Sequence, residues 1–161
     1  MWIKLNYNIE KLQEKIKTIE NHDLSLFNKT TLIIDLLNSL GNIINFKTFE
    51  INQKAKECEI ANSFVLLFQT LNRYNIFFNI YNDYLNDYNE KNKDLKPTSQ
   101  NYCYYFNQLW QYVYLIDKND DETLDYLNIN LHETVYCLII LLLKEESNKS
   151  LDQILEDTWM L

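Results

Sequence analysis

Two pairs of polar residues stand out because each interrupts a strongly apolar stretch with the same spacing. Asp35 and Asn38 are three residues apart, and so are Glu59 and Asn62. Residues three apart share one face of an α-helix. If the two stretches are neighbouring helices, an acidic group and an amide from each would meet in one polar pocket. By spacing alone, the pairs fit either a ligand site or a buried hydrogen-bonded cluster.

The elements that would hold these pairs are helices. Gly41 and Pro97 are the chain's one glycine and one proline, whereas β-rich folds use both residues heavily in turns. Apolar residues recur at three- and four-residue steps. We therefore predict an all-α fold, a single-domain helical bundle of about six helices over residues 1–161. The expected helices are 8–20, 28–45, 52–88 (with a bend possible in its asparagine-rich tail), 99–116, 122–144 and 150–159.

Charge and composition exclude several function classes. The net charge is −8 and no basic stretch is evident, so a polynucleotide partner is not expected, although a free nucleotide remains compatible if metal ions neutralise its phosphates. The longest apolar run, Val135 to Leu143, is far shorter than the roughly 20 residues that span a bilayer. We expect no membrane partner and a cytoplasmic protein. Its three cysteines, distant from one another, are expected to be buried free thiols.

A resemblance to a known family rests on the order of motifs around the two pairs. The first pair is followed by Phe46-Lys47-Thr48-Phe49, and the second leads into an apolar segment. This order resembles the all-α dUTP pyrophosphatases (dUTPases), relatives of the MazG nucleotide pyrophosphohydrolases. That family presents Glu-x-x-Glu, then Phe-Lys-x-Trp, then Glu-x-x-Asp. Gln13, with Ile16 and Ile19, is similar to the family's N-terminal Gln-x-x-Leu-x-x-Ile segment.

The resemblance implies an all-α dUTPase/MazG-like fold, a homodimer and a site for Mg²⁺ and a nucleotide such as dUTP or dUMP. Its metal ligands would be Asp35, Asn38, Glu59 and Asn62, with Glu59 and Asp35 as the catalytic carboxylates. Substrate contacts would come from Lys47, Gln13, Phe46 and Phe49.

The departures from the family pattern bear directly on activity. Asparagine stands at two of the four carboxylate positions, and Phe49 replaces the tryptophan. Magnesium prefers anionic oxygens, and the neutral amide of asparagine carries no such charge. Nor can the amide act as a general base. The sequence leaves three readings open. In the first, the chain is an active Mg²⁺-dependent dUTP or nucleoside triphosphate pyrophosphohydrolase. In the second, it is a relative with impaired or lost hydrolysis that binds a nucleotide or a protein. In the third, it is an unrelated helical interaction protein.

Overall fold

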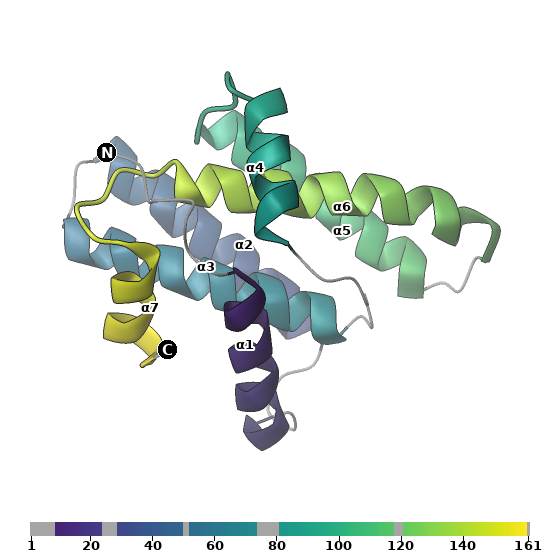
Figure 1. The fold of residues 1–161 in the computed structure, drawn as a ribbon, viewed down its shortest axis with the longest axis horizontal. Coiled ribbons are helices and arrows are strands. Elements are labelled where there is room, and N and C mark those ends of the chain that lie inside the picture. Colours follow the sequence, from purple (N-terminus) through teal and green to yellow (C-terminus); the bar gives the residue numbers. More distant parts are fainter. Residues whose placement is uncertain (1–8, 24–28, 50–51, 74–80, 118–120, 161) are drawn as a thin grey trace.

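A computed structural model of the chain describes residues 9–23, 29–49, 52–73, 81–117 and 121–160. These residues form helices and no strand, which confirms the all-α prediction (Figure 1). Within the described residues there are seven helices where the sequence predicts about six, and the difference lies in the predicted third helix. The helices are α1 (Ile9–Asp23), α2 (Lys29–Thr48), α3 (Gln53–Arg73), α4 (Asn82–Lys91), α5 (Ser99–Asp117), α6 (Asp121–Leu143) and α7 (Leu151–Trp159).

The second half of α6 is the most deeply buried part of the described chain. Every residue from Val135 to Leu143 is at most 1% exposed. A helix that is apolar on all sides has to be covered on all sides. Packing against α5 and α4 supplies much of this cover (Figure 1). Among the described helices, none is long and apolar enough to cross a membrane.

The two predicted ligand pairs lie on α2 and α3, which pack against each other over most of their lengths (Figure 1). α1 and α7 pack against α3 as well. α2 buries Leu32, Leu36 and Leu40, but Ile34 and Leu37 are 46% and 47% exposed. One side of this helix is therefore apolar and still faces outward.

The predicted third helix does not continue to Tyr88. α3 ends at Arg73 and α4 begins at Asn82, while residues 74–80 lie outside the described ranges. Tyr81 has an extended backbone and no side-chain cap. Its N–H instead donates to the hydroxyl of Tyr136 on α6, at 3.0 Å. The Tyr88 ring stacks on that same tyrosine, with ring centroids 4.9 Å apart, so α6 helps to set where α4 begins.

Two smaller expectations have different outcomes. α7 begins one residue after the predicted Ser150, whose hydroxyl caps the helix by accepting a hydrogen bond from the N–H of Gln153 at 3.3 Å. The three cysteines are free, but Cys137 alone is buried, since Cys58 is half-buried and Cys103 is exposed. The prediction of three buried thiols is wrong for Cys103, which lies on the outer side of α5.

Candidate functional site

The predicted pairs belong to a set of polar residues on the adjoining helices α2 and α3, which we call the polar row and define as Asp35, Asn38, Ser39, Glu59, Asn62 and Ser63. Its centre is the Ser39 hydroxyl, which donates to Glu59 Oε2 at 2.8 Å. The Ser63 hydroxyl donates to Ser39 Oγ at 3.0 Å. Both serines are buried, while Glu59 is half-buried. Glu59 thus meets α2 through a serine that the sequence analysis did not select.

A local signal for these serines was available. Ser39 follows Asp35 by four residues, and Ser63 follows Glu59 by four. Residues four apart lie on the same helix face. The two acidic residues and the two serines therefore form a matched pattern on facing helices. Sequence reasoning considered only the three-residue spacing and missed it.

The second half of the row meets α7. Trp159 Nε1 donates to Asn62 Oδ1 at 2.9 Å. α7 packs against α3, and this contact ties its last residue to the middle of α3. An oxygen that accepts an indole N–H has one fewer lone pair available for a cation.

The four predicted metal ligands are not joined to one another by any hydrogen bond or ion pair in the part of the chain that the structure describes. Asp35 is half-buried, whereas Asn38 is exposed rather than inward-facing. Within the same ranges, no three His, Cys, Asp or Glu side chains are grouped so that they could hold a metal ion. A cation at this row would have two carboxylates at most, one of them already bound by Ser39.

The predicted substrate residues divide between different parts of the fold. Gln13 is buried on α1, which packs against α3. Phe49 is 67% exposed just after the end of α2. Phe46 and Lys47 line a cleft of about 590 Å³ at the end of α2. The cleft residues do not overlap with the polar row.

This cleft, which we call the lysine cleft, is built from four separate segments. They are the end of α2, the start of α3, the α4–α5 connection and the segment after α6. Its lining residues are Phe46, Lys47, Gln53, Lys56, Lys96, Pro97 and 144–146. Four lysines and two glutamates give the lining a formal charge of +2, in a chain whose net charge is −8.

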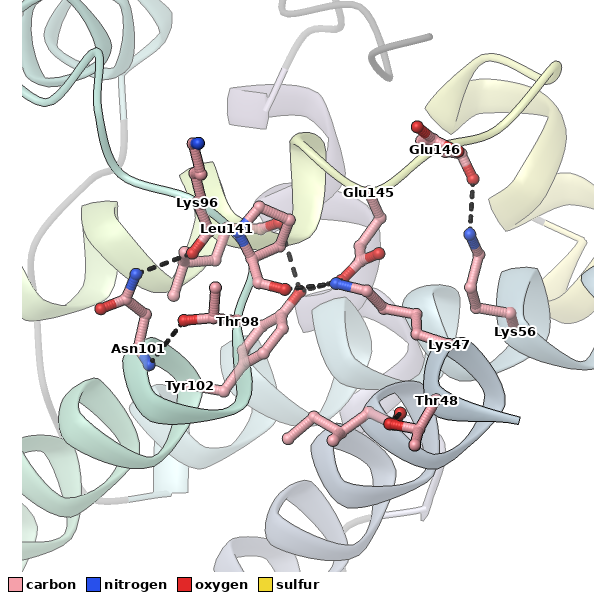
Figure 2. Close-up of polar contacts among 12 residues, drawn as sticks. Lys47, Thr48, Lys56, Lys96, Thr98, Asn101, Tyr102, Leu141, Glu145 and Glu146 are labelled. Carbon is pink, nitrogen blue, oxygen red and sulfur yellow. Dashed lines mark hydrogen bonds and ion pairs between the residues drawn. The ribbon is translucent and has the colours of Figure 1, made fainter. Parts of the chain in front are cut away.

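A buried carboxylate holds one wall of the lysine cleft together (Figure 2). Glu145 is 1% exposed, and its Oε1 accepts from Lys47 Nζ at 3.0 Å and from the Tyr102 hydroxyl at 2.8 Å. Lys47 Nζ also donates to the carbonyl of Pro97. Burial raises the pKa of Glu145, against the opposing effect of the nearby Lys47 ammonium. Burial and the Glu145 charge together raise the pKa of the Tyr102 hydroxyl.

Two other lysines of the cleft hold backbone carbonyls. Lys144 Nζ donates to the carbonyls of Asn92 at 3.1 Å and Leu95 at 2.6 Å, and burial lowers its pKa. Lys56 Nζ donates to the Glu146 carbonyl at 2.7 Å (Figure 2). These bonds satisfy carbonyls that loops would otherwise leave unpaired away from water. The same bonds fix the ammonium groups at the cleft.

Comparison with known proteins adds no relative: no protein-family model, no curated protein and no solved structure matches the chain.

Proposed function

We propose that the chain binds a nucleotide on a helical scaffold of the all-α dUTPase type and hydrolyses it little or not at all. The observation that carries this proposal is the commitment of the polar row to the protein itself. Glu59 Oε2 is bound by Ser39 and Asn62 Oδ1 by Trp159. The motif order from Asp35 to Asn62 supports the family relationship.

The charge of the row supports weak hydrolysis. Mg²⁺ in a nucleotide site binds phosphate oxygens and activates the attacking water, and it gives up its own waters reluctantly. Asp35 and Glu59 are the residues that would hold it. Their combined charge is −2, whereas four carboxylates in the family pattern would give −4. The neutral amides of Asn38 and Asn62 replace neither the charge nor the general base.

The direct test is release of pyrophosphate from dUTP, first with Mg²⁺ and then with Mn²⁺, compared with a Glu59→Ala protein. We expect the two proteins to release no more than a trace, while equilibrium titration detects dUTP binding to the unmodified chain. Efficient release that disappears in Asp35→Ala would contradict the proposal and identify an active pyrophosphohydrolase. Absence of dUTP binding would leave a protein partner as the ligand of this scaffold.

The proposal includes a homodimer that covers the outer side of α2. Ile34, Leu37 and Gly41 lie on one face of this helix, at spacings of three and four residues. The two apolar side chains are nearly half exposed, and a Cβ atom added at Gly41 would meet nothing within 4 Å. A second copy would remove this apolar side from water.

Sedimentation velocity at micromolar concentration tests the dimer. We expect a dimer for the unmodified chain and a shift towards monomer for Leu37→Ser, because the serine removes apolar contact area. Asn45→Ser, an exposed change near the end of the same helix, is the control. A monomer for the unmodified chain would contradict this part of the proposal.

A further inference from the structure

The lysine cleft combines features of an anion site that the polar row does not share. Lys47, Lys56, Lys96 and Lys144 line one concavity of a strongly acidic protein. Like charges gathered in a concave, partly desolvated site focus the electric field and raise the local concentration of opposite charge. The two glutamates of the lining do not cancel this effect, since four lysines face two carboxylates.

The two glutamates leave donors of the ammonium groups available to an incoming anion. Glu145 is buried and its Oε1 is engaged by Lys47 and Tyr102. Glu146 binds Lys56 and Gln53 through its backbone carbonyl, so these contacts leave its carboxylate out of the cleft's hydrogen bonds. Fixed positive charge therefore remains at the lining.

The ammonium groups of Lys56 and Lys47 are also ordered before any ligand arrives. Fixing a lysine side chain costs rotamer entropy, which a preformed site has already spent. An ammonium has three donors. Within the described residues Lys56 uses one of them, on Glu146, and Lys47 uses two, on Glu145 and Pro97.

Lys96 is the lysine of the cleft best placed to meet a ligand. Its side chain is exposed, and no hydrogen bond or ion pair of its ammonium occurs within the described residues. Its backbone is nevertheless fixed, because Asn101 Nδ2 donates to the Lys96 carbonyl at 2.8 Å (Figure 2). Lys144 holds the preceding carbonyl, that of Leu95, at 2.6 Å. An anchored backbone with an available ammonium suits capture of a mobile anion.

We infer that the lysine cleft binds the phosphoanhydride chain of a small molecule directly, through Lys96, Lys56 and Lys47, without a metal ion. Lysine is a common point-charge ligand for phosphate oxygens. The volume of about 590 Å³ lies within the range of small-molecule sites. Phe46 and Pro97 add an apolar wall for the rest of such a molecule. The inference goes beyond the proposed function, since the cleft and the polar row have no residue in common, and it stands whether or not dUTP is hydrolysed.

Isothermal titration calorimetry in the presence of EDTA tests the inference with two probes, inorganic tripolyphosphate and dUTP. Both carry the same phosphate chain, and the chelator removes any route through a divalent metal. We expect saturable binding that weakens as salt is added. Equal affinity for both probes identifies an inorganic polyphosphate chain as sufficient, and tighter binding of dUTP identifies a nucleotide. No saturation with either probe up to about 1 mM would overturn the inference.

Matched lysine variants assign the binding to the cleft. Lys96→Ala should weaken tripolyphosphate binding about tenfold, since it removes a charge-assisted contact from an exposed position without disturbing the fold. Lys54→Ala removes the same charge from an exposed position on α3 outside the lining, and affinity should stay within about twofold. An equal loss in both variants would show only a general effect of charge and would overturn the assignment.

A substitution that should strengthen tripolyphosphate binding completes the test. Glu145→Gln keeps an oxygen that can accept from Lys47 and Tyr102 but removes a negative charge from the cleft. Tripolyphosphate binding should tighten about threefold, because the lining then has one fewer carboxylate to repel the phosphates. Unchanged or weaker binding in a variant that remains folded by circular dichroism would contradict the inference.

Discussion

The polar row and the lysine cleft are built in opposite ways. The row lies between two helices that are consecutive in the chain, and its central contact joins residues 20 positions apart. In the cleft, Lys47 meets a carboxylate 98 positions away. The row offers acidic groups and amides, whereas the cleft has an excess of ammonium groups. A polar pair repeated on neighbouring helices is visible in a sequence, while a site assembled from distant segments is visible only after folding.

The two regions also differ in what their carboxylates do for the fold. Glu145 is buried and joins the segment after α6 to both α2 and α5. Glu59 is half-buried and meets one hydroxyl of α2. We therefore expect Glu145 to contribute more to stability than Glu59, although the sequence pattern points to Glu59.

Replacing the two carboxylates by alanine should show this difference as the largest effect. Glu145→Ala leaves the Tyr102 hydroxyl and the Lys47 ammonium without their shared acceptor, so we expect a loss of about 2–3 kcal/mol in the free energy of unfolding. Glu59→Ala should cost about 1 kcal/mol or less, since water can reach its site. Urea unfolding at neutral pH measures both. Equal losses would mean that Glu59 contributes as much to stability as Glu145.

Removing the serine at the centre of the row should have an intermediate effect. Ser39→Ala deletes the donor to Glu59 and the acceptor for Ser63, and we expect a loss of about 1 kcal/mol. A double-mutant cycle with Ser63→Ala should give a combined loss smaller than the sum of the single losses, because the serines share a hydrogen bond. Strictly additive losses of unfolding free energy would contradict the description of the row as a connected cluster.

The smallest expected effect is a pH dependence confined to the cleft. Burial raises the pKa of Glu145 above its ordinary value of 4.5, so the folded protein keeps this proton at pH values where the unfolded chain has lost it. The resulting stabilisation is fully present below about pH 4.5 and is lost as pH rises through the raised pKa. Glu145→Gln cannot titrate. The unfolding free energy of the unmodified chain minus that of Glu145→Gln should therefore fall as pH rises above about 4.5, and a constant difference would contradict the assignment.

Much of the fold was predictable because its signals are local. The scarcity of glycine and proline and the recurring apolar steps predicted the all-α class, and Ser150 marked the start of α7. The break between α3 and α4 was not predicted, because one hydrogen bond that places the start of α4 comes from Tyr136 on α6. A hydrogen bond to a distant hydroxyl leaves no trace in the neighbouring sequence.

The candidate sites, too, could be predicted only where their signals are local in the sequence. The α2–α3 row could be predicted as far as its members' types and spacing, and Ser39 could have been added from its distance to Asp35. The partnership of Asn62 with Trp159, 97 positions away, could not. The lysines of the cleft had no common motif, since each belongs to a different segment. Lys56 and Lys144 act on backbone carbonyls, which every residue carries.

The burial of α6 has a consequence for the order in which the protein can assemble during its synthesis. α2 and α3 are neighbours in the chain, so they can pair as soon as both have left the ribosome. α5 has to wait for α6, its main partner, whose buried half ends at Leu143. At the translation rate of about 5–20 residues per second, that interval is on the order of seconds. Throughout it, the side of α5 that α6 covers in the folded protein remains open to water.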